Sequence, residues 1–196
     1  MYRKFFKRFF DLCATLLFLP FYLIIFLILA IVIVIDDKGP VIYSSARLGK
    51  NGKVFKMYKF RSMKVNAPDI RNEDGSTFNA NNDPRVTKVG RILRKTSIDE
   101  LPQVINVLKG DMSLIGPRPD LDNQISFYDM NTETKFKVRP GLTGYAQVNG
   151  RNLVKWEDKI KLDRYYVEKV CLKLDIIIFF KTIKKILTFE GVNKNG

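Results

Sequence analysis

Residues Leu12 to Ile35 read LCATLLFLPFYLIIFLILAIVIVI, and no side chain in this stretch carries a formal charge. As a straight α-helix at about 1.5 Å per residue, its 24 residues would reach roughly 36 Å, more than the roughly 30 Å of a bilayer's hydrocarbon core. A secretory signal peptide fits poorly, because the stretch is long for one and no small-residue cleavage site follows it. The sequence therefore predicts a membrane-inserted helix near the N-terminus.

Two features of this helix favour a re-entrant path over a simple span. Pro20 removes one helical hydrogen bond and clashes with the carbonyl of Leu16, in a neighbourhood that the hydroxyl of Thr15 is placed to help satisfy. Basic residues also flank both ends, and the positive-inside rule places both flanks in the cytoplasm. We expect residues 1–37 to form a helix-break-helix that enters the membrane, bends at Pro20 and returns, and residues 38–196 to form a cytoplasmic domain. A kinked spanning helix is the alternative.

The overall composition narrows the chemistry. The chain has 34 Lys and Arg against 20 Asp and Glu, which implies a polyanionic partner such as nucleic acid, an anionic membrane surface or a phosphorylated substrate. It has no histidine, which excludes Ser-His-Asp triads and histidine-ligated metals. Cys13 and Cys171 have no metal-like spacing, and no disulfide framework is expected. Any reaction must therefore use carboxylates and a hard, oxygen-binding cation.

The patterning after the membrane segment predicts an α+β fold that is mainly helical with one β-hairpin. Val41 to Met63 reads as the hairpin, with turn residues at Gly49 to Gly52. A helical stripe follows over Val86 to Arg94. A second helix is expected from Ser97, where Ser97 and Glu100 have the spacing of a capping box, to Lys109.

Two amphipathic helices are expected near the C-terminus, over Trp156 to Val170 and Leu174 to Leu187. The second carries lysines on its polar side. It either packs on the core as an ordinary surface helix or lies in the membrane interface with its apolar face toward the lipid.

The stretch with the clearest chemical content is residues 96–119, TSIDELPQVINVLKGDMSLIGPRP. Asp99 and Glu100 are adjacent carboxylates in a first helical turn, where acids often do no more than complement the helix dipole. Here Arg94 precedes them and Arg118 follows in a proline-locked turn. A carboxylate can accept a phosphoryl group, arginine pairs bidentately with phosphate oxygens, and a second carboxylate can bind a divalent cation. Phosphoryl transfer is one reading of this pattern.

Four blocks of the sequence are similar to those of a known family: KMYKFRSM (56–63), NDPRVTKVGRILRKTSIDELPQVINVLKGDMSLIGPRP (82–119), VRPGLTGYAQVNGR (138–151) and LDRYYVEK (162–169). They resemble the bacterial sugar transferase family, the monotopic phosphoglycosyl transferases. The resemblance runs from Met1 to about Val192. Since no further hydrophobic span follows, the chain resembles the small, single-domain branch of the family.

This resemblance implies a ping-pong reaction at the cytoplasmic face of the bacterial inner membrane, early in glycoconjugate assembly. Asp99 would attack the β-phosphate of a UDP-sugar and expel UMP, and polyprenyl (undecaprenyl) phosphate would then take the sugar phosphate from the enzyme. Asp99 and Glu100 would bind Mg²⁺ or Mn²⁺, with Glu100 as the main metal partner. Arg94 and Arg118 would bind phosphate. The implied partners are the UDP-sugar, polyprenyl phosphate, an anionic phospholipid membrane and candidate glycan-assembly enzymes.

Other basic residues have two readings each. Lys59 and Arg61 either line the nucleotide site or are ordinary strand charges, and Arg139 and Arg151 either contact the ligand or form structural ion pairs. The sequence also departs from the family pattern, because Leu19 rather than serine precedes the helix-breaking Pro20.

Two other classes of function account for less of the sequence. A membrane-anchored nucleic-acid-binding protein would also be basic, but the chain has no recognition module, and nucleic acid is not an expected partner. A structural scaffold would leave the Asp99–Glu100 pair unexplained.

Overall fold

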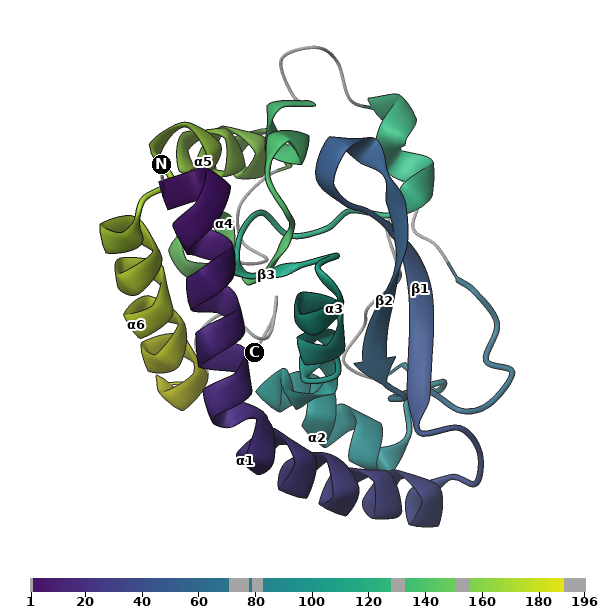
Figure 1. Cartoon of the computed structure of the whole chain (residues 1–196). Coiled ribbons are helices and arrows are strands. Elements are labelled where there is room, and N and C mark those ends of the chain that lie inside the picture. Colours follow the sequence, from purple (N-terminus) through teal and green to yellow (C-terminus); the bar gives the residue numbers. More distant parts are fainter. Residues whose placement is uncertain (1, 71–77, 79–82, 128–132, 151–155, 189–196) are drawn as a thin grey trace.

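The computed structural model describes residues 2–70, 78, 83–127, 133–150 and 156–188. Helices and short helical turns dominate, and the strands form two small sheets (Figure 1). The elements in chain order are η1 (Tyr2–Phe6), α1 (Lys7–Asp36), β1 (Ile42–Leu48), η2 (Lys50–Gly52), β2 (Val54–Phe60), α2 (Lys88–Thr96), η3 (Ile98–Glu100), α3 (Gln103–Lys109), β3 (Ser113–Ile115), η4 (Asp122–Phe127), η5 (Glu133–Lys137), β4 (Gly141–Thr143), α4 (Tyr145–Asn149), α5 (Trp156–Lys169) and α6 (Leu172–Thr188).

The apolar N-terminal stretch forms one continuous helix, α1, with Pro20 inside it. Figure 1 shows its purple ribbon turning sharply about halfway along. A proline is the usual cause of such a kink, because it removes one backbone hydrogen bond and displaces a carbonyl. The helical backbone continues through Pro20, so the expected break takes the form of a bend. Thr15 was expected to help the backbone at this bend, but its hydroxyl donates to the carbonyl of Asp11 at 2.6 Å instead.

Most apolar side chains of α1 are exposed. Leu17, Phe21 and Leu27 are each more than 60% exposed, whereas Tyr22 and Ile33 are buried against the rest of the chain. Within the described residues, α1 is the one helix long and apolar enough to cross a membrane. A continuous apolar surface of this size is unusual on a water-soluble protein, so α1 has the surface expected of a membrane-inserted helix.

The predicted hairpin is confirmed. β1 and β2 pair antiparallel from Ile42 opposite Phe60 to Leu48 opposite Val54. The turn between them contains Asn51 and Gly52, both with positive φ, a conformation that asparagine and glycine tolerate best. The hairpin stands across the molecule from α5 and α6 in Figure 1.

The segment around the paired carboxylates differs from the expected single capped helix. Ser97 adopts a left-handed conformation that ends α2, and its side chain makes no capping hydrogen bond. A short 3₁₀ turn, η3, follows, and α3 begins only at Gln103, after Pro102. The capping-box prediction was therefore wrong, because the carboxylate of Glu100 binds other side chains instead of reaching back to Ser97.

A second, parallel pair of strands was not predicted. β3 pairs with β4, Ser113 opposite Gly141 and Ile115 opposite Thr143. The two backbones approach so closely that a Cβ on Gly141 would lie 2.0 Å from the nitrogen of Gly116. Only glycine fits there, and this contact fixes the chain on either side of the Gly116–Pro119 turn.

The two expected C-terminal helices are confirmed as α5 and α6. They pack on β3 and α4 through a buried cluster made of Ile115, Val148, Tyr166, Val167 and Ile178. The buried hydroxyl of Tyr166 donates to Asp175 of α6 at 2.8 Å and also lies 3.0 Å from the carbonyl of Ile115. These contacts hold both helices against the strand that leads into the Gly116–Pro119 turn.

Candidate active site

The paired carboxylates lie in the turn between α2 and α3. Asp99 is only 8% exposed, and the side chain of Glu100 is 17% exposed. Because η3 connects the end of one helix to the start of the next, both side chains are held at fixed positions by the helices on either side. The structure thus brings the two predicted catalytic residues into one sheltered place.

Cations from two distant parts of the chain converge on this pair. Lys59 of β2 places its Nζ 2.7 Å from Oε1 of Glu100 and 3.7 Å from Oδ2 of Asp99. Arg118 donates from Nη2 to Oε1 of Glu100 at 2.7 Å and from Nη1 to Oε2 at 3.2 Å. This two-pronged contact is the geometry in which arginine binds carboxylates and phosphates most strongly. Lys59 and Arg118, two of the residues expected to bind phosphate, therefore lie beside the carboxylate pair.

The surroundings push the pKa values of the two carboxylates apart. Burial raises the pKa of Asp99; the charge of Lys59 opposes this, and the charge of Glu100 adds to it. Burial alone would also raise the pKa of Glu100, but the charges and hydrogen bonds of Arg118 and Lys59 lower it well below its usual range. Two neighbouring carboxylates with separated pKa values are a common arrangement in active sites, where each acid has a different role.

Arg94 supplies a further cation at the end of α2. Its Nε donates to Oγ of Ser62 at 2.9 Å, which anchors the side chain. Burial lowers the pKa of Arg94, and the nearby charge of Asp99 opposes that shift. Arginine stays protonated in proteins, so Arg94 places a permanent positive charge beside Asp99.

Two other predicted basic residues are engaged elsewhere. Arg61 is buried, donates to the carbonyl of Pro40 at 2.6 Å and binds the carboxylate of Asp37, so it secures the turn that follows α1. Arg139 donates to the carbonyl of Gly110 at 2.7 Å, at the far end of α3 from the carboxylates. Arg151 lies outside the described residues.

Arg47 is a further cation near the site that was not among the predicted site residues. Burial lowers the pKa of Arg47, and the neighbouring charge of Arg118 lowers it further, which places the two guanidinium groups near each other. The hairpin register contained a signal for it. Tyr43 pairs with Lys59, and Arg47, four residues after Tyr43 on the same strand, points to the same face. Counting along β1 in steps of two from Tyr43 would have placed Arg47 on the same face of the hairpin as Lys59.

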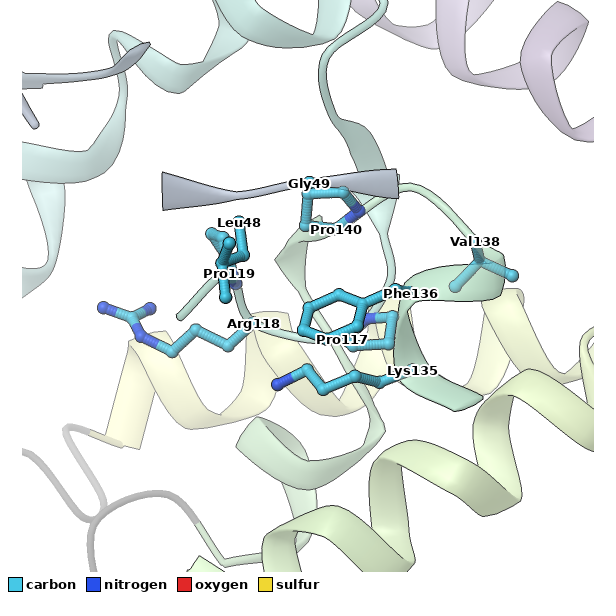
Figure 2. Close-up of a pocket in the computed structure, with 9 residues that line it drawn as sticks. All are labelled: Leu48, Gly49, Pro117, Arg118, Pro119, Lys135, Phe136, Val138 and Pro140. Carbon is cyan, nitrogen blue, oxygen red and sulfur yellow. The ribbon is translucent and has the colours of Figure 1, made fainter. Parts of the chain in front are cut away.

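The turn that carries Arg118 is supported by side chains of neighbouring segments. Figure 2 shows a small pocket lined by Phe136, Pro117 and Pro140 among others, with Arg118 and Lys135 extending toward the same side of the view. Neither Asp99 nor Glu100 lines this pocket. Lys135 binds Asp120, directly after the turn, and its Nζ also lies 3.4 Å from Asp163 of α5. These ion pairs tie the turn to α5.

This support gives the first prediction, which concerns stability. Burial raises the pKa of Asp163 to about 6, an effect that the charge of Lys135 only partly offsets. The folded protein therefore binds this proton more tightly than the unfolded chain does. The resulting stability, up to about 3 kcal/mol, is present at low pH and is lost as the pH rises through about 6. The Asp163→Asn variant should lack this contribution, and urea unfolding in detergent should show the difference between pH 4 and pH 7.

A matched control is Asp158→Asn, which changes an exposed carboxylate of the same helix paired with Lys161. The unfolding midpoint of this control should follow the wild-type pH dependence. If the midpoints of Asp163→Asn and the wild type also run parallel from pH 4 to pH 7, the raised pKa of Asp163 is contradicted.

The Asp99–Glu100 pair, called the dyad below, offers ligand atoms that fit Mg²⁺ or Mn²⁺. Asp99 and Glu100 offer hard carboxylate oxygens, and Mg²⁺ is commonly held by one or two carboxylates together with substrate phosphates. No cluster of three or more acidic or cysteine ligands occurs among the residues that the structure describes. A cation bound here would therefore take its remaining ligands from substrate and water.

Comparison with known proteins identifies the family of this chain. The family model described as bacterial sugar transferase matches residues 2–189. A protein named uncharacterized sugar transferase EpsL of Bacillus subtilis is 42% identical over 97% of this chain and 91% of its own length. The undecaprenyl-phosphate galactose phosphotransferase of Salmonella typhimurium is also 42% identical, over 96% of this chain.

The chain spans less than half of the length of two of these relatives. It spans 42% of the Salmonella protein and 45% of the UDP-N-acetylgalactosamine-undecaprenyl-phosphate N-acetylgalactosaminephosphotransferase of Aeromonas hydrophila, to which it is 42% identical. These two matches cover 96% and 95% of this chain. With the family model matching nearly the whole chain, this protein belongs to the bacterial sugar transferase family.

Proposed function

We propose that this protein is a phosphoglycosyl transferase that moves a sugar-1-phosphate from a UDP-sugar to undecaprenyl phosphate and releases UMP. The observation that carries the proposal is the buried carboxylate of Asp99, beside the ionised Glu100 and among Lys59, Arg94 and Arg118. The names of the Salmonella and Aeromonas relatives support it, since both include undecaprenyl phosphate and the second includes a UDP-sugar.

In the first proposed step, an oxygen of Asp99 attacks the β-phosphorus of the UDP-sugar. A bond forms between that oxygen and phosphorus, and the bond from phosphorus to the bridging oxygen breaks. UMP leaves with this oxygen and its electron pair, so that Asp99 carries the sugar phosphate. The raised pKa of Asp99 favours this role, because a less stabilised carboxylate is a stronger nucleophile.

In the second proposed step, a phosphate oxygen of undecaprenyl phosphate attacks the same phosphorus. The bond to Asp99 breaks, the carboxylate is restored, and the lipid diphosphate sugar leaves. Lys59, Arg94 and Arg118 stabilise the negative charge on the phosphate oxygens in both steps. A Mg²⁺ or Mn²⁺ ion held by Asp99 and Glu100 would supply further neutralisation of diphosphate charge. Glu100, kept ionised by Arg118 and Lys59, remains a ligand and not a nucleophile.

The proposed location is the cytoplasmic face of the bacterial inner membrane, with α1 as a re-entrant helix. Both ends of α1 contact the same aqueous domain: Arg8 donates to the carbonyl of Val107, and Asp36 accepts from the backbone N–H of Val89. A straight span would put these ends on opposite sides of the bilayer. We also propose that α6 lies in the membrane interface, since its exposed apolar residues include Ile176, Ile177, Phe179, Phe180 and Leu187.

A labelling experiment tests this topology. In a variant with Cys13 and Cys171 replaced by serine, a single cysteine at Tyr2 or at Lys38 should react in intact cells only with a membrane-permeant reagent. Both ends should behave alike, because the bent α1 returns them to the cytoplasmic side. Reaction of the Tyr2→Cys variant with a membrane-impermeant maleimide applied to intact cells would contradict the re-entrant path.

The proposed reaction is tested by measuring UMP. Purified enzyme in phosphatidylglycerol-containing vesicles, given undecaprenyl phosphate and Mg²⁺, is assayed with UDP-galactose, UDP-glucose and the UDP-N-acetylhexosamines. At least one donor should yield UMP together with a lipid-linked sugar in equal amounts. If every donor leaves both products at background, the proposed function is wrong, and a scaffold role becomes the better explanation.

A further inference from the structure

The segment that carries the dyad is held at both ends by the membrane helix. At one end, the Asp36 carboxylate at the end of α1 accepts the backbone N–H of Val89, in the first turn of α2, at 2.9 Å. At the other end, Arg8 near the start of α1 donates to the carbonyls of Val107 and Leu108, in the last turn of α3, at 2.6 and 3.1 Å. The contacts are thus made to the outer ends of the two helices on either side of η3.

Both contacts are made at helix ends, where such partners are favourable. The first N–H groups and the last carbonyls of a helix have no partner within the helix. The helix dipole also favours a negative charge at the N-terminus and a positive charge at the C-terminus. Asp36 and Arg8 supply these charges in the matching places. Because hydrogen bonds to charged groups are short and directional, they fix where α2 begins and where α3 ends relative to α1.

Between these two ends, α1 contributes to a buried apolar cluster that neighbours of the dyad also contact. Ile33 of α1 is 3% exposed and lies in a buried cluster with Phe60 and Leu93. Ile98 and Leu101 pack against this same cluster. Ile98 immediately precedes Asp99, and Leu101 immediately follows Glu100. The apolar surface of α1 therefore supports the residues on both sides of the dyad.

Two of the cations that face the dyad, Lys59 and Arg118, come from outside the α2–η3–α3 segment. Lys59 is on β2 and Arg118 is in the turn after β3, so their 2.7 Å contacts to Glu100 depend on where the α2–η3–α3 segment sits. Misplacement of a reacting group by about 1 Å can cost on the order of 10²-fold in rate. The position of this segment is therefore under tight functional constraint.

We propose that α1 is a part of the catalytic architecture as well as an anchor, and that Arg8 and Asp36 are positioning residues for the dyad. By holding the outer ends of α2 and α3, they set Asp99 and Glu100 against Lys59 and Arg118. The bent shape of α1 in the bilayer is thereby coupled to the geometry of the dyad. The kinetic test of this inference rests on the proposed function. The structural test does not require any activity.

The kinetic test compares variants in vesicles of phosphatidylethanolamine and phosphatidylglycerol. Arg8→Gln and Asp36→Ala should each lower kcat for UMP release about tenfold and leave the KM for the UDP-sugar unchanged, because the chemistry is misaligned while donor binding is kept. Asp36→Asn should recover most of the activity, since its amide oxygen can still accept from Val89. The matched control is Arg3→Gln, because Arg3 also donates to a carbonyl, that of Lys137, outside this segment.

The structural test is hydrogen exchange of a peptide covering residues 97–102 in the same vesicles. Exchange should quicken in Arg8→Gln and Asp36→Ala and stay at the wild-type rate in Arg3→Gln, with all variants still floating with the vesicles. Unchanged exchange and unchanged kcat in both variants would overturn the inference. Equal losses in Arg3→Gln would also overturn it, since they would indicate general loosening of the N-terminus. A wild-type enzyme that releases no UMP would instead count against the proposed function, and the exchange result would still decide this inference.

Discussion

The Asp99→Asn variant is expected to lose turnover by about 10³-fold or more while remaining folded, because asparagine keeps the size of the side chain but cannot act as the phosphoryl acceptor. Asp99 makes only one ion-pair contact among the described residues, the 3.7 Å approach of Lys59. Removing its charge therefore breaks little of the fold. Burial raises the pKa of Asp99 because it disfavours the charged carboxylate. Replacing that charge with a neutral amide should therefore not destabilise the protein. UMP release and unfolding midpoints, measured side by side, check both expectations.

The matched control is Asp158→Asn, which neutralises an exposed carboxylate of α5. It should keep wild-type turnover and a wild-type unfolding midpoint. If Asp99→Asn retained a tenth or more of the wild-type rate, Asp99 would not be the nucleophile. Direct attack by the lipid phosphate would then be the better mechanism, with Asp99 and Glu100 acting as metal ligands.

The Glu100→Gln variant is expected to lower kcat by about 10²-fold, because it removes an ionised group that organises the surrounding cations. Glu100 binds Lys59 at 2.7 Å and both terminal nitrogens of Arg118. Without its charge these cations lose their shared partner, and a divalent cation loses a ligand. The Mg²⁺ concentration needed for half-maximal activity should therefore rise, as a titration of UMP release against Mg²⁺ would show.

The control for this change is Glu168→Gln, whose carboxylate pairs with Arg164 on the exposed face of α5. Its Mg²⁺ titration should overlay that of the wild type. A Glu100→Gln variant with reduced kcat but an unchanged Mg²⁺ requirement would show that Glu100 acts through Lys59 and Arg118 alone. Full wild-type turnover in excess EDTA would remove the metal from the account altogether.

The elements that sequence predicted well are those with a strong local signal. The hairpin follows from β-rich stretches on either side of a Gly-Lys-Asn-Gly turn, and the positive φ of Asn51 and Gly52 explains why those residues occur there. The apolar run at the N-terminus identifies α1, and the single proline of the run, Pro20, lies inside this bent helix. The carboxylate pair stood out because two acids are flanked by arginines in one continuous stretch, and its expected roles came from the resemblance to the family.

What sequence could not predict depends on contacts between distant residues. The Ser97–Glu100 spacing is that of a capping box, yet Glu100 is bound by Arg118 and Lys59, and this tertiary contact overrides the local preference. Arg61 stands three residues before Lys64 in a basic stretch whose pattern suggests a nucleotide site. In the structure its guanidinium group is instead bound by the carboxylate of Asp37 and the carbonyl of Pro40. The parallel pairing of β3 with β4 joins strands of three residues each, too short for a periodic signal.

The central claim is that Asp99 carries the sugar phosphate between the two half-reactions, and the most direct measurement is mass spectrometry of the enzyme itself. The wild type is incubated with UDP-sugar and Mg²⁺ in the absence of undecaprenyl phosphate, quenched, digested and analysed. We predict a mass increase of one phosphosugar on a peptide containing Asp99, released UMP in equal amount to the modified enzyme, and loss of the adduct when undecaprenyl phosphate is added. An unmodified Asp99, with no UMP released until the lipid is supplied, would contradict the covalent mechanism.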